Sequence, residues 1–419
     1  MNTILRKKTI LTIFLMMGYV FFASIIFAAY HHEGEKDSAK FLEAYPDKAH
    51  TKLDQCILCH SGGSYNNNGK NVTLGSCQWC HQVYGYDGSG NILETINPYG
   101  KAFHDAGRNA TAIKAIENID SDGDGFSNKY EIDADRFPGN VLDDPTKVPA
   151  PFKVFSKTDL KAMPKHTEFL LMNTSRSGDF YAEYSGVPVE ELLKQAEILN
   201  SATGITVFSP DGWSQYHPLS ETEDQTLYPV SFLYPQANYQ YDPAAVWCEY
   251  TAPSCIGRNH NDPIVIQGGL KLLFAYQREG VDLNVGHLNE DNKLDGEGPY
   301  RVVVPQRVPS PPDQLSKNSN PALIWPYENS WDHNAGSSTR TVTMIRIEPL
   351  PEGTTDIDIL EAGWKYVDEE KVIVYGAIAG GNPPPHSIWD ADGNNKWSLA
   401  DIVLGLQILS GQNKIDNEQ

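Results

Sequence analysis

Hydrophobic positions along this chain follow two periods, and the switch between them divides the sequence. Helical spacing of apolar residues marks 97–104, 110–119 and 189–199. From 151 to 380, short runs rich in Val, Ile and Tyr alternate with turns that contain Pro, Gly and Asp, which is typical of β-strands. Such runs include 205–208, 272–276 and 301–304. The pattern predicts a small α-helical region near the N-terminus and a mainly β (α+β) region after it.

The first 29 residues have the pattern of a secretory signal peptide. Arg6, Lys7 and Lys8 precede an apolar run at 9–27, and small residues follow that run. The run is long for a signal peptide, so an uncleaved membrane anchor remains an alternative. In both cases we expect the rest of the chain to be exported, to the periplasm or to the cell surface and extracellular space.

The net charge of the chain limits the classes of molecule that we expect it to bind. The 419 residues include 54 acidic and 33 basic side chains, which gives a formal net charge of −21 at pH 7. This balance argues against nucleic acid or anionic lipid as a partner. It favours solubility and calcium binding. The length predicts two or three domains.

Two copies of one pentapeptide carry the strongest chemical signal. Residues 56–60 and 77–81 both read Cys-x-x-Cys-His, which is the attachment pattern of c-type haem. In each copy the two thiols form thioethers to the haem, and the histidine coordinates the iron. The pattern assigns the thioethers to Cys56, Cys59, Cys77 and Cys80, and the iron to His60 and His81.

The same cysteines leave two alternatives open. Their spacing also fits a four-thiolate zinc site, or each pair closes a disulfide. The histidine after each pair and the expected export favour haem. The remaining cysteines, Cys248 and Cys255, are close in sequence and expected in an oxidising compartment, so we predict a disulfide between them.

Surplus histidines near the motifs predict the second axial ligand of each iron. Six of the 12 histidines fall within the first 104 residues, and no methionine lies between Met17 and Met163. We therefore expect bis-histidine iron, which transfers electrons and binds no substrate. His50 and His104 are the expected distal ligands.

The loop at 120–131 has the pattern of an EF-hand calcium site, and it also resembles the calcium turns of thrombospondin type 3 repeats. Oxygen donors stand at loop positions 1, 3, 5, 9 and 12, a backbone carbonyl serves at position 7, and glycine at position 6 permits a sharp turn. We expect a structural calcium ion here. The expected ligands are Asp120, Asp122, Asp124, Phe126, Asn128 and Glu131.

A second loop, at 390–401, repeats this spacing near the end of the chain. With the apolar helical pattern that follows, it resembles one repeat of a dockerin module. A dockerin has two such repeats. We therefore expect a calcium-stapled, EF-hand-like element, with cohesin-type or other cell-surface docking as the alternative. Its expected ligands are Asp390, Asp392, Asn394, Lys396, Ser398 and Asp401.

Segments of the β region resemble, in order, landmarks of the molybdopterin domain of sulfite oxidases. They are residues 160–167, 186–193, 208–214, 272–276, 298–305 and 344–348. The resemblance covers 157–348, and it implies the fold of that domain and a molybdenum centre held by a cysteine between the first two landmarks. Residues 169–178 contain no cysteine. We therefore expect the fold without bound molybdopterin.

These features divide the chain into predicted domains. They are a signal peptide at 1–29, a dihaem cytochrome c domain at 30–117, a calcium loop and linker at 118–150, a sulfite-oxidase-like domain at 151–380 and a dockerin-like element at 381–419. The expected function is electron transfer by an exported dihaem c-type cytochrome, with other redox proteins or cytochromes as partners. Two alternatives are a haem-linked oxidoreductase acting on a small substrate and a surface scaffold or adhesion protein that carries haem.

Overall fold

The computed structural model describes most of the chain between residues 36 and 381. The described residues are 36–49, 51–54, 56–67, 70–74, 79, 83–84, 89–174, 178–211, 213–242, 248–289, 294–313, 328, 330–357 and 363–381. Among them the protein is mostly β-sheet with few helices, as the hydrophobic pattern predicts. Within these ranges, no helix has the length and apolarity needed to cross a membrane.

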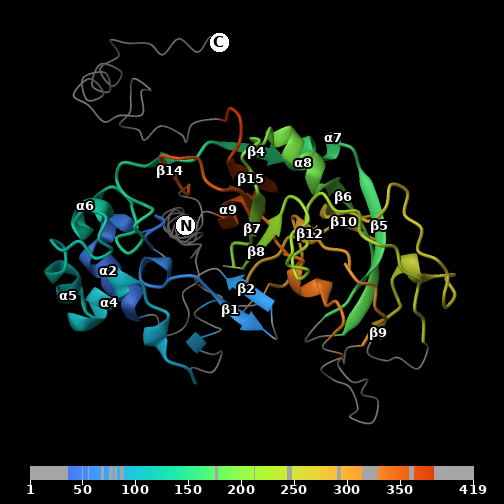
Figure 1. Ribbon diagram of the computed structural model, residues 1–419, viewed down its shortest axis with the longest axis horizontal. Coiled ribbons are helices and arrows are strands. Elements are labelled where there is room, and N and C mark those ends of the chain that lie inside the picture. Colours follow the sequence, from blue (N-terminus) through green and yellow to red (C-terminus); the bar gives the residue numbers. More distant parts are fainter. Residues whose placement is uncertain are drawn as a thin grey trace, which may run out of the picture.

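Four short helices gather at one side of the molecule (Figure 1). They are α2 (Lys36–Ala44), α4 (Pro98–Asp105), α5 (Ala110–Ala115) and α6 (Asn128–Asp133), with the 3-10 turns η1 (Pro46–Lys48), η2 (Cys56–Leu58) and η3 (Ile92–Glu94) between them. Three of the four begin at a side-chain cap: Asn97, Asn109 and Ser127 each accept a backbone N–H of the first turn. We call residues 36–137 the helical unit.

The helical unit has an apolar core of its own. That core contains Phe41, Tyr45, Leu53, Leu58, Tyr99, Phe103, Ala112, Ile113, Ile116, Ile132 and Phe137. A hairpin leaves this unit directly after the first Cys-x-x-Cys-His motif. Its strands β1 (Gly63–Asn67) and β2 (Lys70–Leu74) are antiparallel, and Gly63 lies opposite Leu74.

The remaining part, residues 150–378, forms a sheet unit with two main sheets. The first has the order β11 (Val281–Asp282), β10 (Leu273–Arg278), β6 (Asp179–Pro188), β5 (His166–Met172), with β12 (Arg301–Val303) on β10 and β9 (Cys248–Glu249) on β6. The second has the order β4 (Phe152–Ser156), β15 (Lys371–Gly376), β13 (Met344–Glu348), β7 (Gly204–Phe208), β8 (Ser214–Pro218). Only β13 and β15 pair in parallel within it.

The two sheets bury a common core. Phe274 of the first sheet and Val207 and Val374 of the second belong to one cluster of buried side chains. Alternate residues of β7 and β13 are buried, as expected for strands with one face on a core. Helix α8 (Val189–Ala196) adds an apolar face with spacings of three and four residues: Val189, Leu192, Leu193 and Ala196. The other small elements are α7 (Lys157–Ala162), α9 (Gly363–Asp368), η4 (Pro253–Cys255) and η6 (Asn334–Ser337).

The predicted elements coincide with observed ones, but two predicted helices are too long. The predicted strands at 205–208, 272–276 and 301–304 correspond to β7, β10 and β12. Helix α5 ends at Ala115 and α8 ends at Ala196. The reason in α8 is local: Glu197 adopts φ 59°, a left-handed conformation that ends the helix.

The predicted disulfide between Cys248 and Cys255 is wrong in this structure, because both side chains are free thiols. Each is buried in an aromatic cluster with Phe169, Tyr181 and Tyr239. Burial raises the pKa of both thiols. Proximity in sequence, and even burial in one apolar cluster, is thus a weak guide to disulfide pairing.

Asp143 joins the helical unit to the sheet unit. One oxygen, Oδ2, lies 2.6 Å from Lys52 Nζ and accepts the backbone N–H of Phe137 at 3.0 Å. The other, Oδ1, accepts the hydroxyl of Thr355 in β14 (Thr354–Thr355). Nearby, β14 pairs in parallel with β3 (Val148–Pro149). Lys52 and Asp143 side chains are only 2% and 3% exposed, so this ion pair is fully desolvated.

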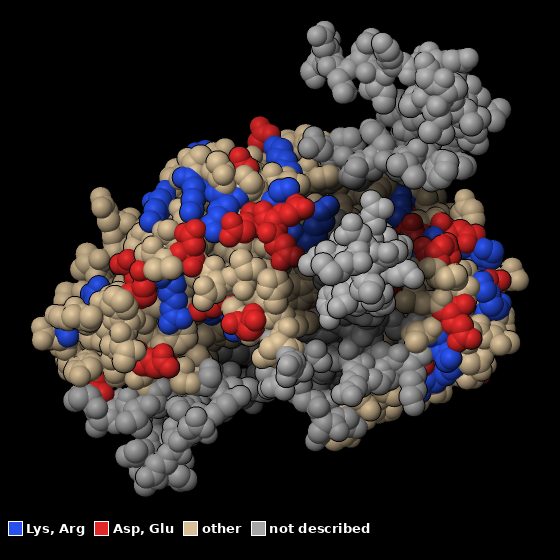
Figure 2. All heavy atoms as spheres, turned by 180° about the vertical axis from the view of Figure 1, so that it is seen from behind, with Lys and Arg blue, Asp and Glu red and all other residues tan. Residues whose placement is uncertain are grey.

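Surface charge is mixed rather than segregated on the face seen in Figure 2, where acidic and basic side chains lie beside one another. Many of the described charges are paired. Lys157 Nζ, for example, lies 2.6 Å from Glu370 Oε1 and 3.0 Å from Asp282 Oδ2. Exposed pairs of this kind contribute little to stability.

Replacing Lys52 with methionine should destabilise the protein strongly. The substitution removes the nearer counter-charge of buried Asp143 and leaves Arg136 Nε, 3.8 Å from Asp143 Oδ1, so we expect a loss of about 3 kcal/mol of unfolding free energy. Urea unfolding measures the change. The matched control is Lys40→Met, which breaks an exposed 2.8 Å pair with Glu43 and should cost less than about 1 kcal/mol. Equal losses in the two variants would contradict a structural role for the buried pair.

His217 should make stability fall in mild acid. Its side chain is fully buried in β8, Nδ1–H donates to the Tyr228 carbonyl at 3.0 Å, and burial lowers the imidazole pKa from 6.5 to about 4. Between these values the unfolded chain binds a proton that the folded protein refuses, so unfolding free energy decreases as pH falls from 6.5 to 4 and levels off below. The full loss is about 3 kcal/mol.

A His217→Asn variant, whose amide still donates to a carbonyl, should lose this pH dependence. Chemical unfolding of both proteins at several pH values between about 4 and 7 measures it. Parallel stability curves for the two proteins across this range would disprove the assignment to His217.

Candidate metal centres

The first Cys-x-x-Cys-His motif forms one tight turn. Cys59 and His60 both donate their backbone N–H to the carbonyl of Cys56, at 3.1 and 2.9 Å. A separation of three residues in such a turn puts two side chains on the same side. Cys56 and Cys59 are both half-buried free thiols. Burial raises the pKa of Cys59 to about 12, so this sulfur is a neutral thiol at physiological pH.

Residues 95–97 stabilise this turn through hydrogen bonds to its backbone. Ser61 donates its N–H to Thr95 O, and Asn97 donates its N–H to Cys59 O, each at 2.9 Å. The Asn97 side chain adds bonds from Nδ2 to the carbonyls of Leu58 at 3.0 Å and Ile57 at 3.2 Å. The carbonyl groups of Ile57, Leu58 and Cys59 therefore all accept from one asparagine that also caps α4.

Gly100 lets α4 approach the motif this closely. A Cβ at this position would lie 2.2 Å from the carbonyl oxygen of Cys59, far inside van der Waals contact. Asn97 Oδ1 accepts the Gly100 N–H at 2.8 Å, which fixes the first turn of α4 against the motif. Thr95, Asn97 and Gly100 are not marked as site residues by the sequence pattern; the Asn-Pro helix start at 97–98 is the one local signal in this segment.

His60 contacts Thr95 through its ring. Its Nδ1 lies 2.7 Å from Thr95 Oγ1. Two thiols and one imidazole thus share a single turn, which is the donor set that covalent haem requires. The second motif, with Cys77, Cys80 and His81, lies outside the described residues, as does His50.

His104, the other expected distal ligand, projects from α4 and is 39% exposed. Its Nδ1 lies 3.2 Å from Asp105 Oδ1. Together with Leu93, Ile96 and Lys101 it lines an open hollow of about 500 Å³. None of Cys56, Cys59 and His60 lines this hollow, so iron ligation by His104 stays a prediction.

The loop at 120–131 joins α5 to α6 and brings its acidic side chains together. Carboxylate oxygens of Asp120, Asp122 and Asp124 all lie within 4.8 Å of one another. Backbone N–H groups shape the loop around them. Asp120 accepts those of Gly123 and Gly125, at 2.7 and 2.9 Å, and Asp124 accepts that of Phe126 at 2.8 Å. Positive φ at both glycines makes these turns possible.

Glu131 adds the strongest reason to place a cation here. Its side chain is fully buried, and neither carboxylate oxygen has a hydrogen-bond partner. One oxygen each of Asp122 and Asp124 is also buried and unsatisfied. Buried charge without partners is costly, and a divalent cation with oxygen ligands would compensate for it. The residues present therefore fit calcium.

Burial and neighbouring charges also raise the pKa values of two carboxyl groups in this loop. Burial, followed by the charges of Asp122 and Asp124, raises the pKa of Glu131 from 4.5 to about 9. Burial and the neighbouring Asp124 raise the pKa of Asp122 from 3.8 to about 6. In the metal-free loop, Glu131 is thus mostly protonated at neutral pH.

Asn128 has another role than the one its loop position predicts. Its Oδ1 accepts the N–H of Ser121 at 3.2 Å, and its Nδ2 donates to Ile116 O at 2.8 Å. The side chain is fully buried and fastens the loop to the end of the preceding helix. The expected calcium donor of Phe126 is its backbone carbonyl, so the contacts of its side chain do not test that prediction. The second predicted loop, at 390–401, lies outside the described residues.

In the sheet unit, the stretch where the resemblance implies a metal-binding cysteine contains a buried asparagine. Asn173 directly follows β5 and is fully buried. Its backbone N–H donates to Asn334 Oδ1 at 3.0 Å, and its Nδ2 donates to Pro311 O at 3.3 Å. An amide held in this way is a poor substitute for a thiolate toward molybdenum.

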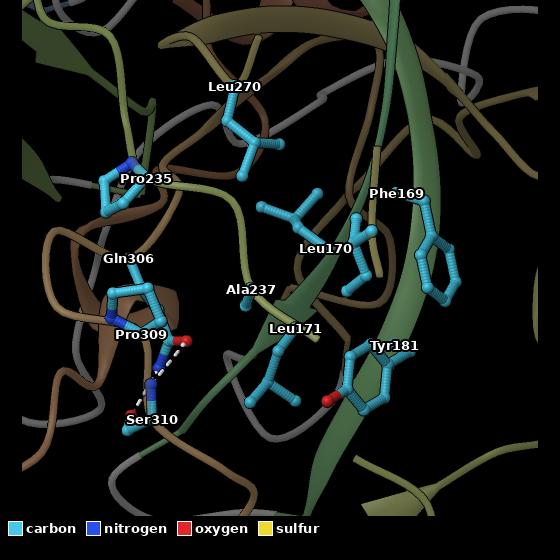
Figure 3. A pocket seen from close by; sticks show the side chains of 11 residues that line it. Phe169, Leu170, Leu171, Tyr181, Pro235, Ala237, Leu270, Gln306, Pro309 and Ser310 are labelled. Carbon is cyan, nitrogen blue, oxygen red and sulfur yellow. Dashed lines mark hydrogen bonds between the residues drawn. The ribbon is translucent and has the colours of Figure 1, made fainter. Parts of the chain in front are cut away.

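A cavity beside β5 and β6 is too small for a substrate. It is lined by Phe169, Leu170, Leu171, Tyr181 and residues of the facing loops (Figure 3), and its volume is about 20 Å³. A hydrogen bond of 2.7 Å from Gln306 Nε2 to Ser310 Oγ closes one side. A volume of this size has room for about one water molecule.

Calcium binding at 120–131 should release protons and depend on pH. Since Glu131 has a pKa of about 9 without metal, apparent calcium affinity should rise about tenfold per pH unit from pH 6 to 9. Calcium titration by calorimetry in buffers of different ionisation enthalpy measures the proton release. Glu131→Gln should bind calcium more weakly and without this pH dependence.

The matched control is Asp133→Asn, which changes an exposed carboxylate of the same helix that pairs with Lys129. It should bind calcium with the wild-type affinity and pH dependence. An affinity for calcium that does not change with pH in the wild-type protein would rule out protonated Glu131 as the titrating ligand.

In comparisons with protein-family models, curated proteins and solved structures, nothing matches this chain. Conclusions about function therefore rest on its own residues and their geometry.

Proposed function

We propose that this protein is an exported dihaem c-type cytochrome that transfers electrons. The observation that carries the proposal is the turn at 56–60, in which two free, half-buried thiols and a histidine lie on one turn held by Asn97. The second copy of the motif, at 77–81, provides for a second haem. Haem supplies a one-electron couple when it is bound, and other redox proteins would be its partners.

The calcium loop is proposed to have a structural role in the same unit. Helices α5 and α6 on its two sides supply Ile113 and Ile132 to the core that also contains Leu58 of the haem-attachment turn. A cation at the loop would hold these helices together by compensating the charge of the three clustered aspartates and of buried Glu131. Extracellular calcium keeps weak sites of this type filled.

For the sheet unit we propose a sulfite-oxidase-like domain without molybdenum, in line with the order of its landmarks and with Asn173. On this proposal the chain has several domains, with a helical haem domain first and a dockerin-like calcium element at the end. The haems are then its redox centres. Catalysis by the sheet unit, and a surface-scaffold role, are the competing functions; stoichiometric molybdenum in the purified protein would favour the first.

The mature protein, produced with a c-type haem attachment system, should carry two covalent haems per chain, one for each motif. The pyridine haemochrome assay counts them, and metal analysis should give iron and calcium without zinc or molybdenum. The double variant Cys56→Ser, Cys59→Ser should carry half as much haem. Cys248→Ser, which changes a buried cysteine outside both motifs, should keep the full content.

Absence of covalent haem from the wild-type protein would end the proposal. Zinc in place of iron would instead support the four-thiolate site.

A further inference from the structure

Thr95 connects the ring of His60 to the backbone through one hydroxyl group. Thr95 Oγ1 lies 2.7 Å from the carbonyl oxygen of Ile92 and 2.7 Å from Nδ1 of His60. A carbonyl oxygen has no hydrogen to give. The hydroxyl must therefore donate its only hydrogen to Ile92.

The bond to His60 then has a fixed direction. Because the hydroxyl hydrogen is already used, Thr95 Oγ1 can only accept from the imidazole, and Nδ1 must carry a hydrogen. A neutral imidazole has one protonated nitrogen, so the lone pair lies on Nε2. This is the tautomer that can bind a metal through Nε2, and in isolated histidine the other tautomer is the favoured one.

Thr95 is held firmly enough to impose this choice. Its side chain is 1% exposed. Its carbonyl accepts the N–H of Ser61 at 2.9 Å, and the next residue, Ile96, forms a β-bridge with His60 itself. The acceptor of the histidine proton is thus fastened to the backbone on both sides of that histidine. Rotation of the imidazole would break a buried hydrogen bond.

We infer that Thr95 is a positioning residue for His60, one that fixes the Nδ1–H tautomer and directs Nε2 toward the iron of the first haem. The inference rests on the proposed function where it concerns iron, and on the geometry alone where it concerns the tautomer. A hydrogen bond from Nδ1–H raises the donor strength of a metal-bound imidazole. A stronger donor stabilises ferric over ferrous iron, so Thr95 should keep the potential of this haem low.

Three variants of the full-length holoprotein separate this role from simple packing. Thr95→Val keeps the shape and removes the acceptor, and it should raise the midpoint potential of one haem and leave the other unchanged. Thr95→Ser keeps the hydroxyl and should restore the wild-type potential. Thr354→Val is the matched control, because Thr354 Oγ1 also donates to a carbonyl three residues earlier, Pro351 O, at 2.7 Å. It should shift neither potential.

The tautomer is measured separately, by nitrogen-15 NMR of histidine-labelled, haem-free protein, with His60 assigned from a His60→Gln variant. The wild type should show Nδ1–H at His60, and Thr95→Val should move the population toward Nε2–H. Wild-type His60 with Nε2–H overturns the inference without need of any variant. Unchanged potentials in a Thr95→Val protein that carries both haems also overturn it. If no haem attaches to the wild type, the proposed function fails, and the NMR result alone decides the tautomer.

Discussion

The buried contact between Lys52 and Asp143 is the constraint on which the arrangement of the molecule depends. Lys52 precedes the first Cys-x-x-Cys-His turn by a few residues, and Asp143 lies in the segment that leads to the sheets. Thr355 supplies the third member from the far end of the sheet unit. Since neither side chain is exposed to solvent, the ion pair stabilises the fold only when all three segments are in place. Burial lowers the pKa of Lys52, while Asp143 opposes that change by favouring the ammonium form.

The helical unit contains another buried acid, Glu131, whose charged surroundings are the opposite of those of Asp143. At Asp143 a buried acid has its cation in the chain, whereas at Glu131 buried acids face one another. The charge of Asp143 is compensated by Lys52 when the chain folds. The charge of Glu131 is removed by protonation or compensated by a metal ion. Without a cation, the raised pKa of Glu131 makes this carboxyl favour folding at low pH, and the advantage is lost as pH rises from 4.5 to about 9.

Residue pattern was sufficient for some of these features and insufficient for others. Local spacing predicted β7, β10 and β12, because strand alternation and strand boundaries are written in neighbouring residues. It also identified the acidic loop, where ligand chemistry and chain spacing coincide. Calcium ligation by Asn128, whose side-chain oxygen accepts the N–H of Ser121, stays a prediction. Local spacing failed for Cys248 and Cys255, which share one apolar cluster yet form no disulfide.

The residue pattern did not predict contacts between segments that are distant in the sequence. Thr95 and Asn97 contact the first Cys-x-x-Cys-His turn from about 40 residues away, and Lys52 contacts Asp143 across a still longer separation; no local pattern marks such pairs. The predicted domains at 30–117 and 118–150 illustrate the same limit. Helix α6 belongs to the apolar core of the first helices, so the helical unit extends past residue 117.

The hairpin β1–β2 limits the distance between the two Cys-x-x-Cys-His motifs. Gly63 and Leu74 are paired across it, His60 stands three residues before Gly63, and Cys77 stands three residues after Leu74. An extended chain covers about 3.5 Å per residue and paired strands lie about 5 Å apart, so the backbone distance from His60 to Cys77 has an upper limit of about 26 Å. The pairing of β1 with β2 thus limits how far apart the 16 residues between His60 and Cys77 allow the motifs to be, and equal lengthening of both strands would leave this limit unchanged.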